Sequence, residues 1–220
     1  MIQLKNVSKT YSNIGQKPVY AVKEATLVIK KGEFVAITGP SGSGKSSLMN
    51  ILGMLDKPTK GEYYFENAGM NTLSEDEMAG IRNKKIGFVF QKFHLLPKTT
   101  ALENVELPLL YSDRKNIRKM ALEALRQVGL SDRATHRANE LSGGQQQRVA
   151  IARALVNEPD IIFADEPTGN LDVASGQEIM KIFQSLNDAG KTIVVITHDR
   201  SVASFAKRTI TILDGLVSEN

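Results

Sequence analysis

The sequence predicts an α/β fold with a parallel β-sheet core, an antiparallel β subdomain in its N-terminal part and an inserted helical subdomain. Three observations predict it. Short β-rich segments come first, apolar runs of strand length then alternate with helical patterns, and residues 92–156 carry helical patterns without a strand candidate. Continuously apolar strands are typical of parallel sheets, because helices cover both of their faces.

The first elements are two β-rich segments, residues 2–11 and 19–30, which a polar stretch over 12–18 joins. We expect them to form antiparallel strands. The run 34–38 is short and apolar, and it ends in a glycine-rich turn that a helical pattern over 45–55 follows. Four further apolar runs are candidates for buried strands, namely 86–90, 160–164, 193–197 and 209–213.

The helical patterns between the strand candidates cover residues 100–111, 116–128 and 143–157. No internal repeat and no Pro/Gly/Ser-rich linker divides the chain, so we expect a single domain over residues 1–220. Within it, we assign residues 1–91 and 157–220 to the α/β core with its β subdomain, and residues 92–156 to the helical lobe.

The composition is that of an ordinary globular domain, with 220 residues of which 41% are hydrophobic and 24% charged. These values exclude a disordered chain and a disulfide-dependent small protein. The net charge of +4 suits nucleic acid, an anionic membrane face or simple solubility, and does not choose among them. Without cysteine the chain has no disulfide or thiolate metal site, and without a signal peptide or a long apolar run we expect a soluble protein whose membrane role would come through a partner.

The strongest motif begins at Gly39 and matches the phosphate-binding pattern G-x-x-x-x-G-K-[ST], between a predicted strand and a predicted helix. Its glycines let successive N–H groups converge on phosphate oxygens, and the helix start adds a favourable dipole. Lys45 can reach the β- and γ-phosphates, and the Ser46 hydroxyl can ligate Mg²⁺. The predicted phosphate-binding residues are Gly39, Pro40, Ser41, Gly42, Ser43, Gly44, Lys45, Ser46 and Ser47.

A second element is the apolar run 161–164, which leads directly into Asp165 and Glu166. A buried strand would deliver Asp165 beside the phosphate loop, where it could hold Mg²⁺ through water. Glu166 would then be placed to polarise an attacking water. Taken alone, such a pair is better explained as a solvated strand end, but together with the phosphate loop it predicts a nucleotide hydrolase.

The segment Leu141-Ser142-Gly143-Gly144-Gln145 is missing from generic phosphate-loop ATPases. With it, the whole chain resembles the ATP-binding subunit of an ATP-binding cassette (ABC) transporter. This resemblance implies a P-loop NTPase (RecA-like) core, with ATP and Mg²⁺ as cofactors. It also implies a head-to-tail homodimer with two-fold symmetry, in which this signature loop faces the phosphate loop of the second copy. Residues Ser142, Gly143, Gly144 and Gln145 would then bind ATP in trans.

Further positions match the family one by one. Tyr11 resembles the aromatic residue that stacks on adenine, and Gln91 the glutamine that approaches Mg²⁺ and the attacking water. Asp172 resembles the loop that crosses the dimer interface, with Asn170 where a small residue is commoner. His198 resembles the switch histidine that contacts the γ-phosphate and orients the catalytic base. The implied catalytic group is Glu166, His198 and Gln91, and the implied magnesium ligands are Ser46, Gln91 and Asp165.

Within the family, segments 56–59, 100–109 and 166–172 look like those of macrolide-efflux and lipoprotein-release exporters, although a cell-division relative has similar segments. That branch implies a separate integral membrane permease, export of a substrate that the permease selects, and a peripheral place on the inner face of the cell membrane. We expect no nucleic-acid partner.

Two other functions remain open from the sequence. A DNA-repair or chromosome-organising ATPase shares the phosphate loop and the signature loop, but it carries a long coiled coil between positions that are only 50 residues apart here, Gln91 and Leu141. A nucleotide-gated module without turnover, like some translation factors, usually holds two cassettes in one chain. DNA binding would support the first alternative, and absence of phosphate release would support the second.

Overall fold

The structure, a computed structural model, describes residues 1–12 and 17–219, so residues 13–16 of the expected polar connection lie outside it. The chain forms two compact units. The first unit contains Met1–Gly80 and the segment from Thr192 onward, and the second contains Ile81–Lys191. Helix α2 (Glu75–Lys85) belongs partly to each.

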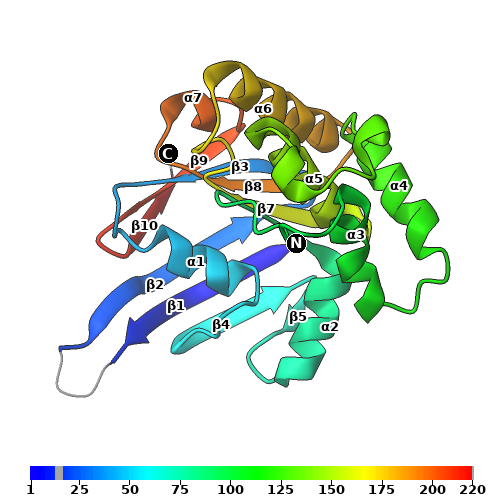
Figure 1. Cartoon of the computed structure of the whole chain (residues 1–220). Helices are drawn as coiled ribbons and strands as arrows, with labels where there is room; N and C mark the ends of the chain where they lie inside the picture. Colours follow the sequence, from blue (N-terminus) through cyan, green and yellow to red (C-terminus); the bar gives the residue numbers. More distant parts are fainter. Residues whose placement is uncertain (13–16, 220) are drawn as a thin grey trace. The chain divides into compact units, whose positions relative to one another are not determined.

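An antiparallel sheet occupies the N-terminal part of the first unit (Figure 1). Its strands are β1 (Ile2–Tyr11), β2 (Val19–Ile29), β4 (Lys60–Phe65) and β5 (Ala68–Gly69), in the order β2-β1-β4-β5. Burial alternates along β1, where Ile2 and Leu4 are buried and Gln3 is exposed, as expected for a sheet with one face in the core. The predicted antiparallel subdomain is confirmed, and β4 and β5 are additions that the sequence did not predict.

The parallel core of the first unit consists of β3 (Phe34–Thr38), flanked by β8 (Thr192–Ile196) and β9 (Arg208–Leu213). Strand β10 (Leu216–Glu219) pairs with β9 in the antiparallel sense. Helix α1 (Lys45–Leu52) follows β3 and contacts both β2 and β8, with its apolar side chains buried. The short helix α7 (Arg200–Ala203) contacts β3. The three apolar runs predicted as buried strands are therefore parallel strands, as expected.

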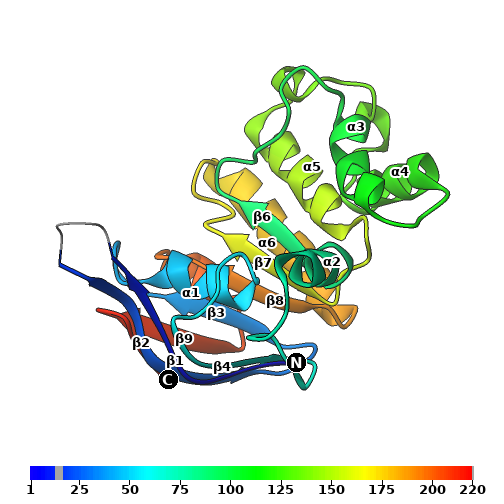
Figure 2. The ribbon, with the colours of Figure 1, turned by 90° about the horizontal axis from the view of Figure 1, so that it is seen from below.

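The second unit combines a parallel strand pair with the helical lobe. Strand β6 (Ile86–Phe90) runs parallel to β7 (Ile161–Asp165), so the remaining two predicted strands are also confirmed. The lobe contains α3 (Ala101–Glu106), the 3-10 turn η1 (Leu107–Tyr111), α4 (Ile117–Gln127), the short turns η2 (Ser131–Arg133) and η3 (Ala138–Glu140), and α5 (Gly143–Leu155). Helices α3, α4 and α5 pack on one another, and α5 also contacts β6 and α6 (Val173–Asp188) (Figure 2).

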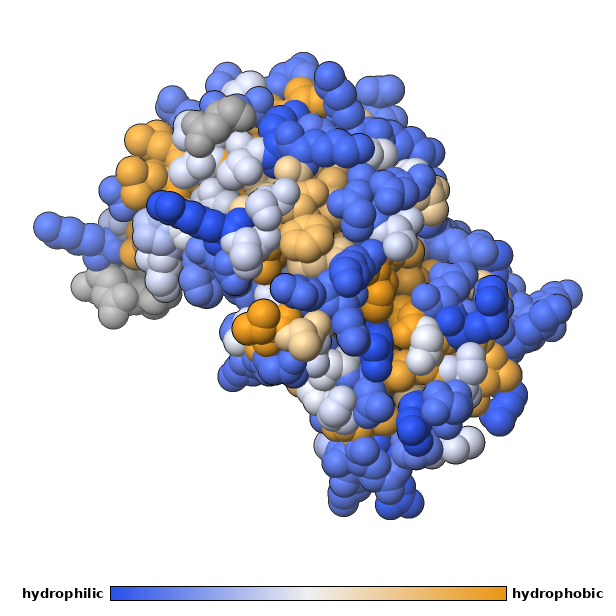
Figure 3. Space-filling view, turned by 90° about the horizontal axis from the view of Figure 1, so that it is seen from above, coloured by the Kyte–Doolittle hydropathy of each residue, from blue (hydrophilic) through white to orange (hydrophobic). Residues whose placement is uncertain are grey.

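The face of the molecule drawn in Figure 3 is mainly hydrophilic, with apolar patches between hydrophilic residues. Among the described residues, none of the helices combines the length and the apolar character that crossing a bilayer requires.

Candidate functional site

The glycine-rich turn between β3 and α1 has a backbone that only glycine can supply. Gly39 and Gly44 have φ angles of 152° and 107°. A Cβ atom would lie 2.1 Å from the Ile212 carbonyl oxygen at the first position and 2.0 Å from the Ala21 carbonyl oxygen at the second. The loop is thus held against β9 and β2, and a side chain at either glycine would force the backbone to move.

The start of α1 gathers groups that bind anions. Its first helical hydrogen bond runs from the Leu48 N–H to the Gly44 carbonyl oxygen at 2.9 Å. The N–H groups of residues 45–47 therefore have no acceptor within the helix. The Lys45 ammonium donates to the carbonyl oxygens of Gly39 at 2.9 Å and Pro40 at 2.7 Å. Among the described residues, the buried Ser43 hydroxyl has no hydrogen-bond partner. These donors fit the phosphate groups of a nucleotide.

The sequence places His198 just after β8, and the structure sets it beside the phosphate loop. Ile37 of β3 pairs with Ile196 of β8 in parallel, so the chain leaves both strands at the same edge. His198 and Gly39 line the same open pocket, which has a volume of about 720 Å³. The two predicted site residues therefore share one pocket in the first unit.

Tyr11, the predicted adenine-stacking residue, is the last residue of β1. It pairs with Val19, two residues before the Ala21 carbonyl that approaches Gly44. Tyr11 as a whole residue is 41% exposed. Its hydroxyl donates to Asp56 Oδ2 at 2.9 Å, a contact that the sequence did not predict.

The strand pair β6 and β7 brings Gln91 and the Asp165–Glu166 pair together in the second unit. Phe90 lies opposite Asp165 in the parallel register, so Gln91 and Glu166 leave neighbouring strand ends. Glu166 has a φ angle of 44°, a left-handed conformation that is uncommon for a residue with a side chain. Its carbonyl accepts the Gly169 N–H at 3.0 Å, closing a tight turn. Such conformations concentrate at functional sites.

The turn after Glu166 returns to Gln91. The Asn170 side-chain amide donates to the Gln91 carbonyl oxygen at 2.9 Å. A Cβ atom at Gly169 would lie 2.6 Å from Gln91 Nε2, so the backbone there runs directly over the glutamine side chain. Asn170 stands where the family commonly has a small residue, and in this chain its side chain makes the hydrogen bond to Gln91.

Asp172 has a local role that the sequence analysis missed. It is the N-cap of α6, with one carboxylate oxygen accepting the Ser175 N–H at 2.9 Å and the other accepting the Ser175 hydroxyl at 2.6 Å. These hydrogen bonds hold the pKa of Asp172 below its usual range. An aspartate just before a helix is a capping signal, so capping accounts for this residue without any second copy. Its place at a dimer interface stays a prediction.

The signature loop starts α5 and is organised as a capping box. Ser142 Oγ accepts the Gln145 N–H at 3.3 Å, and Gln145 Oε1 accepts the Ser142 N–H at 2.9 Å. The Ser142 hydroxyl acts here as an acceptor and keeps its own proton for donation to a ligand. A Cβ atom at Gly144 would lie 3.0 Å from Ser175 Oγ, so the start of α5 lies against the start of α6. The loop therefore sits beside the Asp172 cap.

Two residues of α5 that the sequence analysis did not single out hold the loops of this unit. Gln147 is fully buried, and its amide donates to the Pro167 carbonyl oxygen at 2.7 Å, one residue after Glu166. Arg153 donates to the Phe93 oxygen at 2.7 Å and the His94 oxygen at 2.6 Å, just after Gln91. Burial lowers the pKa of the Arg153 guanidinium. In the sequence, the signal that could have identified Gln147 and Arg153 is a polar residue on the apolar, buried side of a predicted helix.

The predicted magnesium ligands divide between the units, with Ser46 in the first and Gln91 and Asp165 in the second. Hydroxyl, amide and carboxylate oxygens are ligands that Mg²⁺ accepts. Within the part of the chain that the structure describes, no three His, Cys, Asp or Glu side chains gather into a metal site of their own.

Comparison with known proteins relates this chain to one family. The sequence model described as "ABC transporter" matches residues 22–169. An uncharacterised ABC transporter ATP-binding protein of Methanocaldococcus jannaschii, MJ0796, is 57% identical over 99% of this chain and 95% of its own length. The macrolide export ATP-binding/permease protein MacB of Chlorobium phaeobacteroides is 55% identical over 99% of this chain, which spans only 33% of that relative.

Solved structures agree with these sequence matches. A dimeric structure of a post-hydrolysis state of the cassette MJ0796, bound to ADP and Pi, superposes with a TM-score of 0.91 at 54% identity, over 100% of this chain and 98% of that chain. The similarity therefore extends over the complete described fold, including both units.

Proposed function

The chain belongs to the ABC transporter family, in which it is an ATP-binding subunit and an ATPase, and from this premise we propose that two copies close head to tail around two ATP molecules. The observation that carries the proposal is the presence of two anion-binding helix starts in one chain, at Lys45 on α1 and at Ser142 on α5. One γ-phosphate does not need both. The relative MJ0796 forms a dimer in a post-hydrolysis state bound to ADP and Pi, which supports a two-copy site for this chain.

In the proposed site, each group acts on a different part of ATP. Lys45 and the backbone of the phosphate loop bind the phosphate charge, and Tyr11 stacks on the adenine. Glu166 takes the proton of the attacking water, and His198 contacts the γ-phosphate and orients Glu166. Mg²⁺, held by Ser46, Gln91 and Asp165, would neutralise developing charge on the phosphate oxygens. The trans contribution comes from Ser142, Gly143, Gly144 and Gln145 of the second copy.

The contact between Gln91 and Asn170 supports a sensing role for Gln91. Loss of the γ-phosphate would change what the Gln91 side chain contacts, and Gln91 also leads into the helical lobe. A change at this point would move the segment that follows. That segment and the lobe expose apolar side chains, with Leu96, Leu110 and Tyr111 being 48%, 63% and 82% exposed. Exposed apolar groups suit contact with a membrane subunit.

The substrate path lies, in this proposal, in a separate permease. The MacB relatives are named as combined ATP-binding/permease proteins, and this chain spans about a third of their length. We therefore assign it to a macrolide-efflux or lipoprotein-release type of system, as a peripheral subunit on the inner face of the membrane. Co-purification with a permease that bears a large extracytoplasmic domain is the expected result. Isolation with a permease of another architecture would contradict the assignment.

Dimer-dependent turnover gives the direct test of the site. The specific rate of phosphate release by the purified chain should rise with protein concentration and then level off, because each half-site is incomplete in a monomer. Gel filtration at the same concentrations, with and without Mg-ATP, provides the matched measurement. A specific rate that stays constant while the protein elutes as a monomer would contradict the two-copy site.

A further inference from the structure

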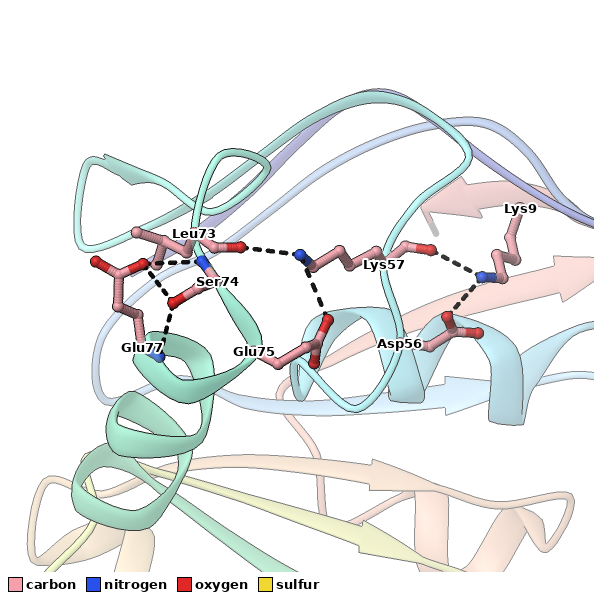
Figure 4. Close-up of polar contacts among 7 residues, drawn as sticks. All are labelled: Lys9, Asp56, Lys57, Leu73, Ser74, Glu75 and Glu77. Atoms are coloured by element: carbon pink, nitrogen blue, oxygen red, sulfur yellow. Dashed lines mark hydrogen bonds and ion pairs between the residues drawn. The ribbon is translucent and has the colours of Figure 1, made fainter.

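A partly buried ion pair between Lys9 and Asp56 contacts Tyr11, the last residue of β1. Lys9 Nζ lies 2.5 Å from Asp56 Oδ1 and donates to the Lys57 carbonyl oxygen at 2.8 Å (Figure 4). The other Asp56 oxygen accepts the Tyr11 hydroxyl at 2.9 Å. The Lys9 side chain is only 12% exposed, which limits screening of the pair by solvent. We call Lys9, Asp56 and Tyr11 the tyrosine clamp.

The clamp joins β1 to the helix that starts at the phosphate loop. Asp56 follows α1, and its N–H donates to the Asn50 oxygen at 3.1 Å, so the end of that helix fixes its position. Further along, Lys57 donates to the Leu73 oxygen at 2.8 Å and lies 3.4 Å from Glu75 Oε1 (Figure 4). Tyr11 is thus linked through Asp56 to the end of α1, the helix whose first turn contains Lys45.

Within the clamp, the Tyr11 ring is restrained in two ways. Its hydroxyl is bonded to Asp56, and the Lys9 ammonium lies over one ring face, 5.0 Å from the centroid. The ammonium occupies one face, so a base can stack only on the opposite face. Burial by itself would raise the pKa of Asp56, but the hydrogen bonds from Lys9 and Tyr11 bring it below its usual range. The carboxylate therefore stays charged at neutral pH.

We propose that Lys9 and Asp56 are positioning residues that hold the Tyr11 ring ready to stack on the base of the bound nucleotide. The inference rests on the proposed function, in which Tyr11 contacts adenine. A ring that is already ordered loses less freedom when ATP binds, so the clamp acts on affinity for the base and leaves the chemical step alone.

The test compares binding of ATP with binding of inorganic tripolyphosphate, which has no base. For Asp56→Asn we expect the Kd and KM for ATP to rise about three- to tenfold, with kcat within about twofold and the Kd for tripolyphosphate unchanged. Tyr11→Phe keeps the ring on the surface and removes only its bond to Asp56, so it should raise the Kd for ATP by a similar factor without risk to folding. Asp56→Asn removes the charge that pairs with Lys9 but keeps a carbonyl oxygen that can accept the Tyr11 hydroxyl, whereas Tyr11→Phe removes that hydroxyl. Both changes weaken the same clamp, so the double variant should lose less than the product of the two single losses.

A second triad on the same sheet provides the control. Tyr64 donates to Glu62 at 2.9 Å, Lys5 lies 3.9 Å from Glu62, and the Lys5 ammonium is 4.8 Å from the Tyr64 centroid. Tyr64 pairs with Gln3, eight residues along β1 from Tyr11, or about 26 Å at strand rise. Glu62→Gln should leave both Kd values unchanged.

The outcomes separate the inference from the function on which it rests. If Tyr11→Ala leaves the Kd for ATP unchanged, the assignment of Tyr11 to adenine is wrong. If Tyr11→Ala weakens ATP binding but Asp56→Asn and Tyr11→Phe do not, only the positioning role is overturned. An equal loss of ATP and tripolyphosphate binding in Asp56→Asn would likewise overturn it, because the change would then act on the phosphate loop.

Discussion

The Glu166→Gln variant should hydrolyse ATP at least about a hundredfold more slowly than the parent chain, because an amide cannot accept the proton of the attacking water. Glutamine has nearly the same shape, so the left-handed turn at this position and its bond to the Gly169 N–H should persist. Single-turnover phosphate release measures the chemical step, and equilibrium binding of ATP should stay within about twofold.

Glu158→Gln is the matched control for this variant. Glu158 belongs to the same unit, has a left-handed φ angle of 57°, and precedes β7 whereas Glu166 follows it. Its side chain forms an exposed ion pair with Arg114 at 3.4 Å, so neutralising Glu158 should change the rate by less than about twofold. The Glu166 variant should also accumulate as a dimer with Mg-ATP in gel filtration. Retention of more than about a hundredth of the parent rate would remove Glu166 from the role of general base.

Continuous apolar runs made the core strands predictable. The runs that became β3, β6, β7 and β8 are buried over most of their length, whereas β9 buries only Ile210 and Ile212. The expected bounds agree with the structure to within one residue. Strand β4 was not predicted, because Lys60–Phe65 mixes charged and aromatic residues without a clear strand pattern. Its pairing with β1 stabilises it as a strand. Helix α1 ends at Leu52, earlier than expected, because Gly53 caps it and Met54 adopts a left-handed φ of 57°.

Local motifs are enough to nominate the phosphate loop and Glu166 as site residues, and their roles stay predictions. Contacts between side chains that are distant in the sequence could not be predicted. Lys9 bonds to Asp56 across 47 positions, and Arg153 reaches the His94 oxygen across 59. The local sequence around Lys9 or Arg153 does not indicate which residue it contacts, because that contact depends on how the elements pack.

Mixing two inactive variants should restore ATP hydrolysis if each ATP site takes its phosphate loop from one copy and its signature loop from the other. Lys45→Ala removes the ammonium of the phosphate loop. Ser142→Asp keeps a good N-cap for α5 but places a negative charge where the γ-phosphate is expected. Each variant alone should lose at least about a hundredfold in rate. A mixed dimer has one site with both changes and one with neither, so an equal mixture should reach up to about a quarter of the parent rate.

The control pairs two changes in the same half-site. Gly44→Ala would place a Cβ atom 2.0 Å from the Ala21 oxygen, so it also disables the phosphate loop. A mixture of Lys45→Ala and Gly44→Ala contains no dimer with an intact site and should stay inactive. Recovery in the first mixture alone requires that the two loops act across copies. If the Lys45→Ala and Ser142→Asp mixture recovers nothing while its subunits are shown to exchange, both loops serve one ATP within one chain, and the head-to-tail site is wrong.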